Sequence, residues 1–319
     1  MRDSTAGWSG AFEIQSILRP RRLKGGIAKP LFQIIDALCE QRTIRLNVDK
    51  IAKSLEVSVL YETAKYGIVR TNARVMNVLF VHNAIPHSIG SMKLRDRIFR
   101  IQEMRVARAA DRVVVHGETQ RAIVFGWTPS DVIAVDLPGD TRQLPESDWE
   151  NRDPFALCLG EVRPNKGIHT ALEAAADAGF RLVVAGRPVP EAYGTEMESK
   201  AAGIGPLVDM KLGYLSSDAF GRLLGEASVI LLPYMTFGAQ SGILARAMQC
   251  KKRIISSDLP SLVEQAGDYG RIDFFPAGDS AALAALLRKT ASATSVEPEA
   301  SSLASEMARW DRLIKQVFD

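Results

Sequence analysis

In the first half of the chain, short β-rich runs alternate with stretches whose apolar residues have helical spacing. Residues 75–81 are mostly apolar, as expected for a strand that is covered on both faces of its sheet. Residues 29–40 instead carry apolar side chains along one helix face. The pattern predicts strands at residues 12–18, 43–48, 57–61, 75–81, 112–116 and 132–135, and helices at residues 29–40, 93–110 and 120–125.

The alternation stops at residues 139–153, a polar segment with several turn formers that is the best linker candidate, and then begins again. Strands that alternate with helices form parallel sheets with right-handed crossovers, and two such sheets in tandem define a cleft. The predicted fold class is therefore α/β, with ligands expected beyond the carboxyl ends of the strands. Strands are predicted at residues 155–159, 182–185, 207–212, 229–232, 253–256 and 270–274, and helices at about 167–178, 218–226, 241–249, 279–289 and 302–317.

Composition narrows the class of protein. A chain of 319 residues is long enough for two domains, and it holds no apolar run near the roughly 18 residues of a membrane span. The three cysteines, Cys39, Cys158 and Cys250, are widely spaced and odd in number, which favours a reducing compartment. The N-terminus lacks the apolar stretch of a secretion signal, so we expect a cytoplasmic protein. The net charge of +3 is far too small for a dedicated nucleic-acid-binding protein, and we expect no nucleic-acid partner.

Two loops in the second half carry candidate chemistry. In the first, a predicted strand leads through Gly160, Arg163 and Lys166 into a helix, and two cations at a helix start favour a bound anion such as a diphosphate. From charge alone, solvated turn residues explain the same cations at least equally well. In the second loop, residues 237–242 combine glycines with Gln240 and Ser241 just before a helix, which offers backbone N–H groups to phosphate or sugar oxygens. Glycines also serve ordinary turns, so this second signal is weak by itself.

Taken together, the motifs resemble the donor domain of glycosyltransferase family 4. The resemblance covers about residues 154–289 and follows the family in order and spacing; within the family it is similar to the subgroup whose loops read G-x-x-R-P-x-K-G and Q-S-G. It implies a GT-B fold, in which two Rossmann-like domains face each other across a cleft. It also implies a nucleotide-sugar donor, no metal or other cofactor, and retention at the anomeric carbon. The matching segments are residues 160–167, 213–218, 227–234, 240–242, 247–248 and 259–264.

The resemblance also implies roles for individual donor-site residues. Arg163 and Lys166 would contact the donor diphosphate and neutralise the leaving group. Gln240 lies in the donor loop, where the backbone amides of Ser241 and Gly242 would hold phosphate or sugar oxygens, and Leu215 would lie near the base through its main chain.

The match is thinner in the first half of the chain. His82 lies in a segment similar to the family's loop after a central strand, and we expect it to be the residue nearest the reacting centre. A structural histidine is an equally good explanation of His82. Gly25 and Gly26 match an early glycine pair and are a candidate acceptor or phosphate loop, although such a pair also suits any turn.

Several positions depart from the family pattern. The broader family has two glutamates around the donor loop, where this chain has Gly238 and Arg246. A buried Arg246 would need an anionic partner. Lys251 replaces a usual glycine, and Glu161 replaces a common arginine directly after the glycine that ends the strand.

Residues 93–110 combine many cations with apolar residues at helical spacing. The helix could rest peripherally on the anionic inner face of a membrane through Lys93, Arg97, Arg100 and Arg105, whereas a solvated helix face is the simpler interpretation by about two to one.

These observations predict a glycosyltransferase of the hexosyltransferase type that moves a sugar from a nucleoside diphosphate to a saccharide or lipid-linked saccharide in cell-surface polysaccharide assembly. Residues 1–145 would form a short acceptor-binding domain, residues 146–300 the donor-binding domain, and residues 301–319 a helix that returns to the first domain. The main alternative is a catalytically inactive homologue that acts as a binding or partner subunit. An epimerase or hydrolase on the same fold is a third hypothesis, supported by fold analogy alone.

Overall fold

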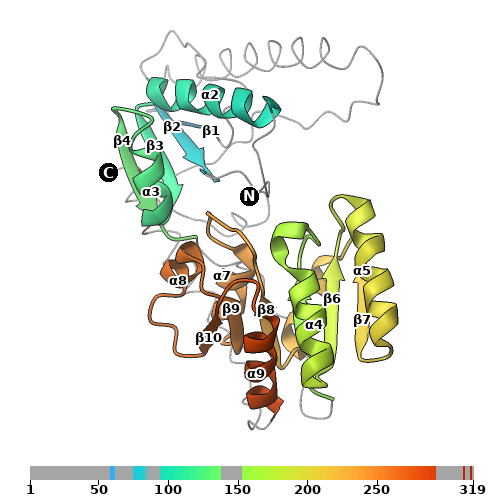
Figure 1. Cartoon of the computed structure of the whole chain (residues 1–319). Coiled ribbons are helices and arrows are strands. Elements are labelled where there is room, and N and C mark those ends of the chain that lie inside the picture. Colours follow the sequence, from blue (N-terminus) through green and yellow to red (C-terminus); the bar gives the residue numbers. More distant parts are fainter. Residues whose placement is uncertain are drawn as a thin grey trace, which may run out of the picture. The chain divides into compact units, whose positions relative to one another are not determined.

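The computed structural model describes residues 58–61, 75–82, 84, 94–137, 153–291, 312 and 317. Contacts along the chain separate it into two compact units, and the change from the first to the second falls between Val135 and Asp136 (Figure 1). Each unit contains one parallel sheet. The elements predicted at residues 12–18, 29–40 and 43–48, the pair Gly25 and Gly26, and almost all of the linker and the last helix lie outside the described residues.

The first unit is built on a four-stranded parallel sheet with the order β1-β2-β3-β4 (Figure 1). Its central strands pair in register, with Val78 opposite Arg112 and Val113 opposite Val132. The described strands and helices agree with those predicted to within two residues at each end. They are β1 (Ser58–Tyr61), β2 (Met76–Val81), α2 (Leu94–Ala109), β3 (Arg112–His116), α3 (Glu118–Val124) and β4 (Asp131–Val135).

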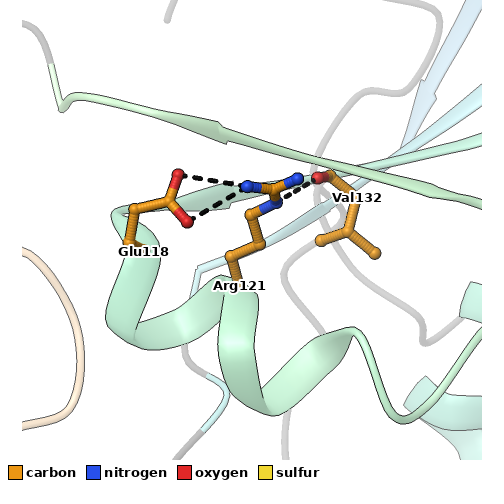
Figure 2. A network of polar contacts seen from close by, with 3 residues as sticks. All are labelled: Glu118, Arg121 and Val132. Carbon is orange, nitrogen blue, oxygen red and sulfur yellow. Dashed lines mark hydrogen bonds and ion pairs between the residues drawn. The ribbon is translucent and has the colours of Figure 1, made fainter.

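Helix α3 is tied to the edge strand of this sheet by one arginine (Figure 2). The Nε of Arg121 donates a hydrogen bond to the carbonyl of Val132 in β4 at 2.9 Å, while its Nη1 lies 3.2 Å from the nearer carboxylate oxygen of Glu118. The ion pair is exposed and stabilises the fold little by itself, but it holds the guanidinium toward the strand. Glu118 lies in the first turn of α3, where its negative charge also interacts favourably with the positive end of the helix dipole.

The second unit contains a six-stranded sheet with the order β10-β9-β8-β5-β6-β7, and every pairing described in it is parallel. The chain runs outward from β5 through β6 to β7, then returns to the other side of β5 and continues through β8 to β10. The order therefore reverses between β5 and β8, which is where open α/β sheets bind their ligands. The strands are β5 (Ala156–Leu159), β6 (Leu182–Gly186), β7 (Val208–Leu212), β8 (Val229–Leu232), β9 (Ile254–Ser257) and β10 (Ile272–Phe275).

Both faces of the four central strands of this sheet, β5, β6, β8 and β9, are buried. In β5, Ala156 and Cys158 pack into one apolar cluster with α4 and α9, while Leu157 and Leu159 pack into a second cluster with α6, α7 and α8. This alternation explains why the strand sequence is apolar throughout. Burial raises the pKa of the Cys158 thiol to about 12, so it is a packing residue and not a nucleophile.

Four of the described helices of this unit agree with the prediction to within two residues: α4 (Ile168–Ala178), α6 (Ser217–Glu226), α7 (Gly242–Gln249) and α9 (Ser280–Ala291). The prediction missed α5 (Glu191–Ile204) and α8 (Pro260–Ala266). Helix α5 contains Gly194, whose missing side chain lets the helix approach Pro188; a Cβ there would lie 2.6 Å from the Pro188 Cβ. Glycine lowers helix propensity, so the glycine that packing requires in α5 also weakened the sequence signal for this helix.

The end of α7 explains one of the departures from the family pattern. Lys251 has a positive φ of 50°, and its N–H and that of Lys252 donate to the carbonyls of Met248 and Ala247. This is the Schellman arrangement that usually places a glycine at the position of Lys251.

The next residue, Lys252, is buried, and its Nζ donates to the carbonyls of Gly225 and Ala227 at the negative end of α6. Burial lowers the pKa of Lys252 to about 8.

No helix among the described residues combines the length and the apolar character that crossing a membrane requires.

Candidate functional site

The carboxyl ends of all six described strands of the second unit lie at one edge of the sheet, because the strands run parallel. The loops after β5 and β8 lie next to each other there, at the point where the strand order reverses. Backbone contacts join them: Met235 N–H donates to the carbonyl of Asn165 at 2.9 Å, and the buried Asn165 side chain donates to the carbonyl of Thr236. The two motifs, which lie in separate loops of the sequence, are therefore held together by direct hydrogen bonds.

Glycine 167 makes this close approach possible. Its φ is 63°, and a Cβ built on it would lie 1.8 Å from the carbonyl oxygen of Pro233. It ends the short 3-10 helix η2 (Pro164–Lys166), and α4 follows directly. The last glycine of the G-x-x-R-P-x-K-G motif is thus explained by backbone geometry: only glycine fits both the conformation and the space.

Lys166 points from the first loop onto two aromatic rings of the second. Its Nζ lies 3.6 Å from the ring centroid of Tyr234 and 4.3 Å from that of Phe237. The two rings meet edge to face with their centroids 5.0 Å apart. The rings stabilise the ammonium charge and fix its place at the edge of the sheet, while an ammonium on an aromatic face keeps donors for an anion.

Arg163 is held by the residue that replaces the usual arginine of the family. Its Nε lies 2.8 Å from the nearer carboxylate oxygen of Glu161, and Glu161 also accepts a hydrogen bond from Arg187 Nη2 at 2.9 Å. Arg163 was predicted as a site residue from its motif, whereas Arg187 was not connected with it. The neighbouring β6 ends at Gly186, so a cation directly after it could have been noticed as a second candidate at the same sheet edge.

The start of α7 is fixed from behind by α8. Ser241 is buried and caps α7, with its Oγ accepting from Leu244 N–H at 3.3 Å and lying 3.2 Å from the Tyr234 hydroxyl. Its backbone N–H donates to Gln265 Oε1 at 2.6 Å, and Gln265 Nε2 donates back to the Ser241 carbonyl. In this structure the Ser241 amide is therefore engaged within the protein, whereas the exposed Gly242 has no acceptor for its N–H among the described residues.

The remaining predicted donor residues lie around the same edge. Gln240 Oε1 accepts a hydrogen bond from Leu137 N–H at 2.6 Å. Leu215 follows β7, and its side chain packs against the apolar cluster that contains Leu224 of α6. Arg246, which was noted as a departure from the family pattern and not as a donor residue, is buried in α7, and its Nη1 donates to the amide oxygen of Gln249 at 2.6 Å.

His82 lies in the first unit, directly after β2, and is exposed. Its ring stacks on that of His116 at the end of β3, with centroids 5.5 Å apart. The buried Gln120 organises this edge: its Nε2 donates to the carbonyl of His116 at 3.1 Å, and its Oε1 accepts from Ala84 N–H. The sequence pattern did not indicate His116 or Gln120 as site residues, because His116 reaches His82 only through the parallel pairing of β2 with β3.

Solved structures with the same arrangement of elements are glycosyltransferases and related enzymes. The Anabaena HepE structure in complex with UDP has a TM-score of 0.62 at 14% identity, covering 86% of this chain and 78% of HepE. Sucrose-phosphate synthase from Thermosynechococcus elongatus has a TM-score of 0.62 at 15% identity, covering 88% and 78%. A glycosyltransferase from Rickettsia africae has a TM-score of 0.57 at 13% identity, covering 93% and 80%. These similarities establish the GT-B fold of two Rossmann-like domains.

No curated protein sequence matches the chain. The family model of glycosyl transferases group 1 matches residues 140–302, just over half of the chain and all of the second unit's sheet. The chain therefore belongs to the glycosyl transferases group 1 family and is a glycosyltransferase.

Proposed function

We propose that the protein is a retaining, metal-independent member of glycosyltransferase family 4 that transfers a sugar from a nucleoside diphosphate sugar to a saccharide or lipid-linked saccharide. One observation carries the proposal: Lys166 and Arg163 stand at the point of strand reversal in the second unit, where the loops after β5 and β8 are joined. The UDP complex of HepE, a structural neighbour, supports a nucleotide ligand for this type of fold. In this proposal the second unit binds the donor and the first unit binds the acceptor.

The chemistry follows from where charge develops. As the bond between the anomeric carbon and the phosphate oxygen breaks, negative charge grows on the diphosphate, and Arg163, Lys166 and the N–H of Gly242 stabilise it. The acceptor hydroxyl attacks the same face of the sugar and gives its proton to the departing phosphate oxygen. Two fixed cations supply the neutralisation that a divalent metal ion supplies in other enzymes. His82 would donate a hydrogen bond to a hydroxyl near the reacting carbon.

A calorimetric titration of the purified protein with UDP, GDP, ADP and dTDP, with and without magnesium, tests the donor site. We expect micromolar binding of one nucleotide that does not depend on magnesium and that weakens at least about tenfold in Arg163→Ala, a loss typical of one charged hydrogen bond. Lys200→Ala serves as the matched control, because Lys200 forms an exposed ion pair with Glu196 on α5. Failure of all four nucleotides to bind would contradict the proposal and favour a homologue without transferase chemistry.

We further propose that α2 contacts an anionic membrane surface from its cytoplasmic side. On this helix Ile98 and Ile101 are 58% and 51% exposed, and Arg97 and Arg105 are exposed beside them. Apolar side chains flanked by arginines suit a bilayer that contains acidic lipids. Arg100 does not belong to this surface, because its guanidinium lies 4.9 Å from the ring centroid of Trp127. Lys93 lies outside the described residues.

Sedimentation with phosphatidylglycerol vesicles and with phosphatidylcholine vesicles tests the membrane contact. We expect the wild-type chain to bind the acidic vesicles alone, and the double variant Arg97→Glu/Arg105→Glu to lose most of that binding, because each cation near the surface contributes about 1 kcal/mol. The double variant Lys200→Glu/Arg222→Glu, at exposed positions of α5 and α6, changes the net charge by the same amount and serves as the control. Equal sedimentation of the two double variants would overturn this part of the proposal.

A further inference from the structure

The chain segments after β5 and β6 stay paired beyond the ends of their strands. Val162 N–H donates to the carbonyl of Arg187 at 2.9 Å, and Val189 N–H donates to the carbonyl of Val162 at 2.9 Å. This parallel bridge joins Val162 with Pro188. The pairing fixes the backbone from which the next side chains extend, at the edge of the sheet where the donor is expected to bind.

Side chains alternate between the two faces of such a ladder. Val162 is 1% exposed and points into the protein. Its neighbours Glu161 and Arg163 therefore point to the opposite face, toward solvent, and the exposed Arg187 meets them there. The close approach of the two segments needs Gly186, since a Cβ at that residue would lie 1.8 Å from the carbonyl oxygen of Gly160.

Glu161 joins the two arginines. One carboxylate oxygen lies 2.8 Å from Arg163 Nε, and the other accepts from Arg187 Nη2 at 2.9 Å. Although burial raises the pKa of Glu161, the hydrogen bond from Arg187 and the charges of both arginines outweigh it and lower the pKa, so the group is a carboxylate at neutral pH. The three side chains carry a net charge of about +1, which leaves the cluster attractive to an anion.

The geometry of the contacts leaves the other donors of each guanidinium for a ligand. A guanidinium has five N–H donors, and Glu161 meets Arg163 at Nε and Arg187 at one Nη. Because both arginines contact one carboxylate, their guanidinium groups lie close enough to meet neighbouring phosphate groups of one ligand. Arginine donors arranged as a fork bind phosphate oxygens in pairs.

We propose that Arg187 is a further donor-binding residue, which contacts the diphosphate together with Arg163, and that Glu161 is the positioning residue that holds both guanidinium groups for this contact. The inference deepens the proposed function and rests on it, because the diphosphate is the donor's. Glu161 thus holds both guanidinium groups in place, and Arg187 supplies a second cation from the adjacent loop.

Calorimetry with the nucleoside diphosphate that binds the wild-type chain tests the role of Arg187. We expect Arg187→Ala to weaken binding about tenfold, with no change in the denaturation midpoint, because the side chain is largely exposed. The matched control is Arg288→Ala, which removes an exposed ion pair of the same geometry with Asp177 at the far end of α4. Wild-type affinity in Arg187→Ala would overturn the inference while leaving the proposed function intact; no binding by the wild-type chain would overturn both.

A double-mutant cycle tests the positioning role of Glu161. If the carboxylate holds Arg187 for the ligand, Arg187→Ala should weaken binding less than about twofold in a Glu161→Ala background. A purely structural role of Glu161 would not move this coupling. If Arg187→Ala costs the same tenfold loss in both backgrounds, Glu161 does not position it.

Discussion

Replacement of Gly167 by alanine is expected to destabilise the second unit by more than about 3 kcal/mol, because two independent costs meet at this residue. The backbone has a φ of 63°, where a Cβ is unfavourable, and the added Cβ would lie 1.8 Å from the Pro233 carbonyl oxygen. Neither the loop nor the end of β8 can move away cheaply, since Met235 N–H and Asn165 join them. Urea denaturation followed by circular dichroism measures the free energy of unfolding.

Gly179→Ala is the matched control for this prediction. Gly179 ends α4 with a φ of 61°, almost the same as that of Gly167, but a Cβ there meets nothing within 4 Å. It should therefore cost only the conformational part, about 1–2 kcal/mol. The difference between the two variants isolates the close approach of the loops. Equal destabilisation of both variants would show that the contact with Pro233 relaxes without cost.

The hydrophobic pattern predicted most of the described fold because strands covered on both faces have a strong sequence signal. It missed α5, although Tyr193, Met197 and Ala201 are buried at intervals of four residues. The glycines at 194 and 203 and the prolines before the helix hid that spacing. Helix α8 was missed because only Leu262 and Ala266 mark its buried apolar face, which is too little to establish a period.

The candidate site was predicted less completely, because its contacts depend on how loops meet. The motif indicated Arg163 and Lys166, but the rings under Lys166 become its partners only through the adjacency of β5 and β8. The pairing of Glu161 with Arg187 depends on the register of β5 with β6. No pattern in the sequence shows that the Ser241 amide is taken by Gln265, since that requires the position of α8.

Among the residues of the joined loops after β5 and β8, we expect Lys166 to contribute most to catalysis. Its ammonium stands on Tyr234, whose hydroxyl lies 3.2 Å from Ser241 Oγ at the start of α7. The lysine thus connects the two halves of the proposed diphosphate site. An ammonium that is held in place before the reaction stabilises the charge of the leaving group without the cost of reorganisation, which is usually the largest contribution to such a rate.

Lys166→Met is therefore expected to lower the rate of sugar transfer or donor hydrolysis about 10²- to 10³-fold, while the free energy of unfolding changes by less than about 1 kcal/mol. Methionine keeps the apolar stem over the rings and removes only the charge. The rate is measured as release of nucleoside diphosphate from the sugar donor that binds the wild-type chain.

Lys166→Arg should recover part of the rate, because a guanidinium also stacks on aromatic rings and donates to phosphate, although its planar shape differs. A rate for the arginine variant between those of the wild-type lysine and the methionine variant separates loss of charge from loss of packing. A methionine variant with nearly wild-type turnover would mean that the leaving group is neutralised elsewhere. The aromatic rings would then serve only to pack Lys166, and the joined loops after β5 and β8 would not be the centre at which the glycosidic bond breaks.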